Sequence, residues 1–79
     1  MIFVYILQSS VDQGYYVGIA QSVDERLLKH NEGGVISTKR RKPFRLVYTE
    51  TFNNYSEARI REKEIKSFKG GLKFKELIK

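Results

Sequence analysis

The 79-residue sequence contains no cysteine, no tryptophan, one proline and one histidine. The lack of cysteine excludes disulfide bonds and a thiolate zinc site, and the single histidine excludes a histidine-rich metal cluster. Long apolar runs are also missing, because the longest, residues 2–7 (IFVYIL), is much too short to span a bilayer. The sequence also lacks the basic leader and small-residue cleavage site of a secretory signal. We therefore expect a soluble, cytoplasmic protein.

A chain of this length has room for one modest core, so residues 1–79 are expected to form a single domain. The formal net charge is +6 and the isoelectric point is about 9.7. A small basic domain most often meets an anionic polymer, although the charge could serve solubility alone. The positively charged residues are concentrated in one segment, because residues 38–45 (TKRRKPFR) contain five lysines or arginines and no acidic residue.

The pattern of apolar residues predicts three strands and three helices, with a capping box at Ser22 and Glu25 and an exposed basic loop at residues 33–43. We expect an α/β protein of the α+β type, in which helices cover a three-stranded, mainly antiparallel sheet in the order β-β-α-β-α-α. The expected strands are residues 2–7, 15–20 and 44–52, and the expected helices are residues 22–31, 54 or 56 to 69, and 72–79, the last with Leu72, Leu77 and Ile78 as its apolar side.

The first helix places polar side chains beside its apolar stripe. At about 100° per residue, His30 lies about 20° from Val23 and Arg26 about 60° from it. Each residue taken alone could have an ordinary structural role. Arg26 could extend its side chain along the border of the core, and His30 could be a hydrogen-bonded histidine near a helix end. Together they direct an imidazole and a guanidinium inward.

The second long helix has a carboxylate in a similar position. Glu62 lies about 40° from Ala58, inside the expected apolar stripe. A carboxylate that faces a small core is costly unless it is paired or bound to a cation. A salt bridge with a nearby arginine or lysine is the alternative. Glu64 is a rival for the same role, but it lies about 200° around the helix, on the expected solvent side.

Two tyrosines complete the set. Tyr5 and Tyr16 fall on adjacent strands of the expected hairpin and on the same face of the sheet. One face would then gather two phenols, a guanidinium, an imidazole and a carboxylate, which is too polar a set for so small a core. Such a set can hydrolyse a phosphodiester, with Glu62 binding a divalent cation, Arg26 binding phosphate and a phenol acting on water. The cations at Lys39, Arg40, Arg41 and Lys42 would hold the polymer backbone.

The ordered motifs resemble the GIY-YIG nuclease family, above all its short stand-alone bacterial members, which are related to the nuclease domain of excision repair. Residues 3–5 (FVY) represent the first motif, with phenylalanine and valine in place of glycine and isoleucine, and residues 16–18 (YVG) represent the second. Arg26 matches the catalytic helix arginine of the family, His30-Asn31 the His-Asn pair of the short members, and Glu62 the metal-binding glutamate.

The resemblance implies a DNA endonuclease that uses one Mg²⁺ or Mn²⁺ ion at Glu62 and acts in repair or recombination, with specificity supplied by a larger repair partner. The implied catalytic residues are Tyr5, Tyr16, Arg26, His30 and Glu62. Gly18 would leave room beside Tyr16 for the first helix and a phosphate. The resemblance does not decide which tyrosine is the base, and RNA is not excluded as a substrate. A non-catalytic nucleic-acid-binding module and a basic scaffold with salt-bridged inward residues are the alternatives.

Overall fold

The computed structural model describes residues 1–79 and contains one sheet, three α-helices and one 3₁₀-helix. It has the predicted element order, with an added 3₁₀-helix (η1) before the third strand. The elements are β1 (Ile2–Ser9), β2 (Tyr15–Ala20), α1 (Val23–Asn31), η1 (Ile36–Arg41), β3 (Phe44–Phe52), α2 (Tyr55–Ser67) and α3 (Leu72–Leu77). No helix is long and apolar enough to cross a membrane.

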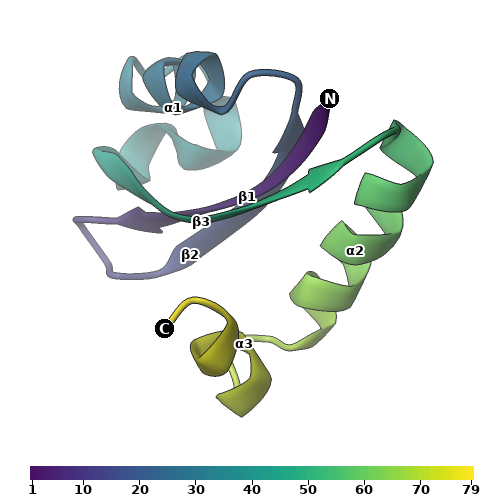
Figure 1. Cartoon of the computed structure of the whole chain (residues 1–79). Helices are drawn as coiled ribbons and strands as arrows, with labels where there is room; N and C mark the ends of the chain where they lie inside the picture. Colours follow the sequence, from purple (N-terminus) through teal and green to yellow (C-terminus); the bar gives the residue numbers. More distant parts are fainter.

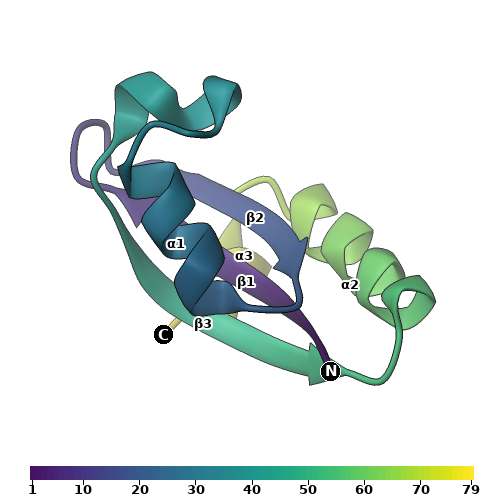
Figure 2. The same ribbon diagram turned by 90° about the horizontal axis from the view of Figure 1, so that it is seen from above.

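The sheet is fully antiparallel in the order β2-β1-β3, so β1 is central and β2 has a free edge. Figure 1 shows α1 and η1 on one face of the sheet and α2 and α3 on the other. The view from above in Figure 2 shows α1 running across the strands, with α2 lying beyond the β2 edge of the sheet. This arrangement agrees with the expected three-stranded sheet covered by helices.

Alternation along the strands divides the apolar residues between two small cores. On the α2 face, β1 contributes Ile2, Val4 and Ile6, which pack against α2 and α3. On the α1 face, β1 contributes Tyr5 and Leu7, which pack against α1 and against Phe44. The two cores give β1 an almost continuously buried sequence, as expected for a strand covered on both faces.

Side-chain caps begin both long helices, at the predicted Ser22 and at Asn54, which is one of the two predicted starts of the second helix. Ser22 accepts a hydrogen bond from the backbone N–H of Glu25 at 3.3 Å, and Asn54 accepts one from the N–H of Glu57 at 2.9 Å. Each cap satisfies one of the backbone donors that a helix start leaves free. These caps fix where α1 and α2 begin, and therefore which residues face the sheet.

Two local predictions are wrong. Residues 33–43 do not form a fully exposed loop, because η1 lies within them and buries Thr38. In α3 the main apolar anchor is Phe74, which is 3% exposed, whereas Leu72 is 74% exposed. Leu72 precedes Phe74 by two residues, so it lies about 200° away on the opposite side of the helix. Leu77 and Ile78 follow Phe74 by three and four residues and share its side.

Candidate active site

The central feature of the site is the phenol of Tyr5, which the middle strand holds fully buried on the α1 face. Its register partner on β2 is Gly18. A Cβ atom at Gly18 would lie 2.5 Å from the Tyr5 hydroxyl oxygen, so no larger residue fits there without movement. The expectation that Gly18 clears space for α1 and a phosphate is therefore corrected, because the space is taken by the Tyr5 ring.

His30 comes from the last turn of α1 and is also fully buried. Its Nε2 lies 3.2 Å from the Tyr5 hydroxyl and its Nδ1 lies 2.7 Å from the Thr38 hydroxyl. Because the Thr38 hydroxyl donates to the Val35 carbonyl at 3.4 Å, we assign the proton of His30 to Nδ1. Nε2 then accepts a hydrogen bond from the Tyr5 hydroxyl.

This chain of hydrogen bonds suits a neutral imidazole. Burial, and secondarily the charge of Arg26, lower the pKa of His30 below its ordinary value. Burial likewise raises the pKa of Tyr5, while the nearby Arg26 guanidinium opposes that effect. At neutral pH the resting site therefore holds a protonated phenol beside a neutral imidazole.

Tyr16 lies on the same face of the sheet, as its spacing predicted. Its ring centroid is 6.2 Å from that of Tyr5 and 4.7 Å from that of His30, with the imidazole set edge-on. Its neighbour Tyr15 points to the opposite face, where it packs against Phe74. The two adjacent tyrosines thus serve different faces of one edge strand.

Arg26 is half-buried on α1, and the nearby phenol of Tyr5 is the main reason that its pKa is raised. No hydrogen bond joins the Arg26 guanidinium to the Tyr5 phenol, and the buried Nε–H of Arg26 has no acceptor. Arg26 also forms no ion pair. It lines an open hollow of about 620 Å³ together with Glu25 and Tyr55. The hollow gives an oxyanion access to the Arg26 side chain, and a guanidinium binds oxyanions strongly.

Glu62 lies on α2, which packs on the other face of the sheet, so the expectation that one face gathers all five polar side chains is wrong. Its side chain is 18% exposed and its carboxylate lies 3.3 Å from Nζ of Lys66. No hydrogen bond or ion pair joins Glu62 to Tyr5, and the charge of Glu62 is the smallest of the influences that raise the pKa of that phenol. Glu64 faces elsewhere and pairs with Arg61. This geometry favours Glu62 over Glu64, and the ion pair between Arg26 and Glu62 expected of a mere scaffold is absent.

Glu62 does not belong to a larger cluster of metal-binding side chains. No group of three or more histidine, cysteine, aspartate or glutamate residues lies together in the structure. One carboxylate is nevertheless compatible with Mg²⁺, which usually keeps several waters and takes one or two protein carboxylates. The donor set therefore fits a hard cation that shares its shell with water and substrate oxygens.

The four basic residues 39–42 differ in their contacts. Arg41 is bound, because its Nε donates to Asp12 at 2.9 Å and its guanidinium lies 5.5 Å from the centroid of the Phe44 ring. These contacts attach η1 to the turn between β1 and β2. Lys39, Arg40 and Lys42 are exposed and form no ion pair.

The structure brings Tyr5, Tyr16, Arg26 and His30 into one cluster and places Glu62 within electrostatic reach of it. Sequence reasoning missed Thr38, which fixes the histidine tautomer. Sequence reasoning also missed the role of Asn31, whose side chain bonds the backbone of Phe44 at 2.6 and 3.0 Å and ties α1 to β3. The His-Asn spacing pointed to Asn31, but nothing in the basic segment pointed to Thr38.

Comparisons with known proteins identify the family of the chain. The model of the GIY-YIG catalytic domain matches residues 1–73. A UPF0213 protein of Staphylococcus saprophyticus is 43% identical over 92% of this chain and 89% of its own length, and one of Staphylococcus epidermidis is 48% identical over 84% and 80%. The solution structure of a UPF0213 protein from Bacillus halodurans is 38% identical, with a TM-score of 0.50 over 94% of this chain and 92% of that one. The chain therefore belongs to the GIY-YIG catalytic domain family, which is a family of nucleases.

Proposed function

We propose that this chain is a divalent-metal-dependent DNA endonuclease, with residues 1–79 forming one nuclease domain that acts in the cytoplasm in repair or recombination. The observation that carries the proposal is the buried Nε–H of Arg26, which has no acceptor and lies in the side-chain cluster of Tyr5 and His30. A buried donor without a partner costs about 1–3 kcal/mol. A substrate phosphate oxygen would remove that cost, so Arg26 supports binding of a phosphodiester.

Tyr5 and His30 provide the route for a proton. Hydrolysis requires that the attacking water lose a proton, which passes to the Tyr5 oxygen as the Tyr5 proton passes to Nε2 of His30. The assigned tautomer supports this route, because it leaves Nε2 of His30 free to accept the Tyr5 proton. Tyr16 makes no side-chain hydrogen bond and packs against the imidazole, so we assign the base role to Tyr5 and a packing role to Tyr16.

Glu62 would hold one Mg²⁺ or Mn²⁺ ion through its carboxylate, with water completing the shell. When bound, the ion would bind a phosphate oxygen and stabilise the charge that develops on it. Arg26 would stabilise the same charge from the α1 face. Lys66 now pairs with Glu62 and would have to release the carboxylate, which is a small cost for an exposed ammonium.

Lys39, Arg40 and Lys42 would hold the DNA backbone outside the cleavage site. Phosphate contacts of this kind position the duplex and do not read its sequence. A larger repair partner would therefore supply specificity.

Plasmid nicking with Mg²⁺, Mn²⁺ or EDTA tests the proposal. Glu62→Gln and Arg26→Gln should each reduce cleavage by roughly 100-fold or more, as expected when a charge-stabilising group is removed. Glu64→Gln is the matched control, since it makes the same change on the same helix outside the cluster. Unchanged cleavage by both Glu62→Gln and Arg26→Gln would reject the assignment of the site.

A second candidate is a non-catalytic nucleic-acid-binding module. It is favoured by Glu62 being a lone carboxylate that is already paired with Lys66. Salt-sensitive DNA binding, without metal-dependent cleavage of any duplex, flap or single-stranded substrate, would establish it.

A further inference from the structure

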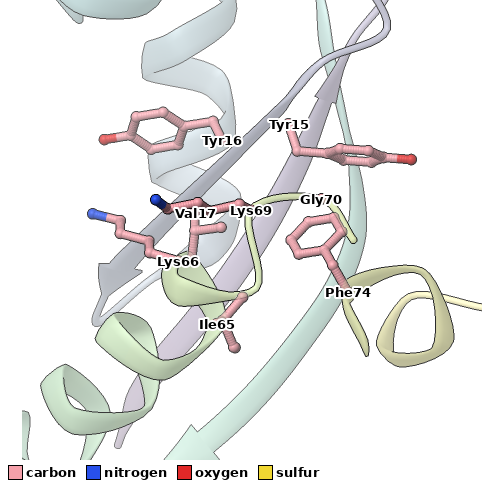
Figure 3. Close-up of a pocket in the computed structure, with 8 residues that line it drawn as sticks. All are labelled: Tyr15, Tyr16, Val17, Ile65, Lys66, Lys69, Gly70 and Phe74. Atoms are coloured by element: carbon pink, nitrogen blue, oxygen red, sulfur yellow. The ribbon is translucent and has the colours of Figure 1, made fainter. Parts of the chain in front are cut away.

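A second hollow lies on the other side of the β2 edge from the catalytic cluster, between β2 and the turn that joins α2 to α3. Its volume is about 400 Å³. Figure 3 shows its walls, with Tyr15 and Tyr16 leaving β2 in opposite directions and Phe74 lying beneath the Tyr15 ring.

The floor and one wall of the hollow are apolar and aromatic. Ile65 is fully buried and Phe74 is 3% exposed, so both are fixed by the core. The Tyr15 ring packs on Phe74 with centroids 4.8 Å apart and planes tilted by 57°, yet Tyr15 is 37% exposed. A half-exposed aromatic ring on a rigid apolar support is a surface on which a flat aromatic ligand can stack.

The rim is cationic and contains no acid. Lys66 and Lys69 are the charged residues of the lining, and Lys69 forms no ion pair. Lys69 and Gly70 adopt positive φ values of 50° and 73°, which turn the chain sharply at the end of α2. This turn sets the Lys69 side chain at the hollow. An anionic group fits the rim, and an aromatic group fits the floor.

The hollow adjoins the catalytic cluster through two residues. Tyr16 lines it and also packs against His30. Lys66 lines it and also pairs with Glu62, the metal ligand proposed above. A ligand in the hollow would therefore contact Tyr16 and Lys66, which themselves contact His30 and Glu62.

We propose that this hollow binds the base of an unpaired nucleotide next to the cleaved phosphate, with its own phosphate on Lys69. A nucleotide combines the flat aromatic ring and the anion that the floor and rim require. A base inside a duplex is stacked on both sides, so only an unpaired base can enter. The substrate is then DNA with a single-stranded segment at the point of cleavage, which specifies the endonuclease function proposed above and rests on it.

Binding without metal tests this inference apart from cleavage. The probe is a 12-nucleotide single-stranded DNA with a central 2-aminopurine, whose fluorescence is quenched when it stacks, and the competitor is the same sequence as a duplex. In EDTA, the wild type should quench the probe and prefer the single strand. Tyr15→Leu should remove the quenching and weaken binding about 5-fold or more, whereas Tyr15→Phe keeps the ring and should retain both.

Lys69→Gln and Lys75→Gln form a matched pair, because both remove one cation but Lys75 is an exposed residue of α3 outside the hollow. Lys69→Gln should weaken single-strand binding several-fold more than Lys75→Gln. The inference is overturned if duplex and single strand bind equally, or if Tyr15→Leu quenches the probe as the wild type does. Absence of metal-dependent cleavage with intact quenching would instead overturn the endonuclease function and leave the hollow as a base-binding site.

Discussion

Gly18 faces Tyr5 across the β1–β2 ladder, so closely that a methyl group on Gly18 would overlap the phenol. The Cβ atom would lie 2.5 Å from the hydroxyl oxygen and 2.6 Å from the ring carbon that carries it. Tyr5 cannot move aside easily, because it is fully buried and bonded to His30. The glycine of the second motif thus fixes the position of the tyrosine of the first.

The first prediction concerns this contact. Gly18→Ala should lower the free energy of unfolding by about 1–3 kcal/mol, as expected for overpacking a rigid core site. It should also lower cleavage activity, because the phenol is displaced from His30. Urea denaturation and plasmid nicking measure the two effects.

Gly70→Asn is a suitable control for Gly18→Ala. Nothing lies within 4 Å of the added Cβ at Gly70, and asparagine tolerates its positive φ of 73°. This variant should unfold at nearly the wild-type urea concentration. Equal stability losses in the two variants would show that the contact with Tyr5 has no special role.

Sequence patterns predicted the elements and most of the cluster because both depend on local periodicity. The inward positions of Arg26 and His30 follow from the turn of α1, and the common face of Tyr5 and Tyr16 follows from the strand period. The capping residues Ser22 and Asn54 set the helix starts from neighbouring residues alone.

What the sequence could not show depends on contacts between distant segments. Thr38 sits among cations, and only the fold of η1 against α1 turns its hydroxyl toward His30. Arg41 looks like its basic neighbours until the β1–β2 turn brings Asp12 to it. Phe74, in contrast, could have been predicted from the sequence. Leu77 and Ile78 follow it by three and four residues, which is the spacing of one apolar side of a helix.

The second prediction concerns Thr38. Thr38→Val removes the acceptor of the buried Nδ1–H of His30, which should cost about 1–3 kcal/mol of stability. Loss of this bond should also free the imidazole to adopt the other tautomer, so that it no longer accepts from Tyr5. Cleavage should fall and its pH profile should shift, while Thr38→Ser keeps the hydroxyl and should restore the wild-type profile. A pH profile unchanged in Thr38→Val would contradict this role.

The third prediction separates two neighbouring arginines. Arg40→Ala should weaken DNA binding and reduce the slope of its salt dependence by about one, with the urea midpoint unchanged, because Arg40 is exposed and unpaired. Arg41→Ala should lower the urea midpoint, because it removes the Asp12 pair and the contact with Phe44. The pair is exposed to solvent, so the loss of stability should be small. Fluorescence anisotropy at several salt concentrations and urea denaturation distinguish the two, and a larger stability loss in Arg40→Ala would refute the division of the segment.

The last prediction concerns the pH dependence of stability. Burial, and secondarily Arg26, lower the pKa of His30 in the folded state below the value of 6.5 expected in the unfolded chain. Below pH 6.5 the His30 ring therefore binds a proton more readily in the unfolded chain than in the folded protein. The free energy of unfolding should be highest above that pH and fall as the pH decreases. The charged groups Asp12 and Glu50 have lowered pKa values and titrate at more acidic pH, which leaves the window from pH 7.5 to 5.5 to His30. The urea midpoint of the wild type should fall across this window, and that of His30→Gln, which carries no titrating ring, should stay nearly constant. A parallel fall in both proteins would mean that His30 is free to take up a proton in the folded state, and the proton route from Tyr5 would then lose its resting acceptor.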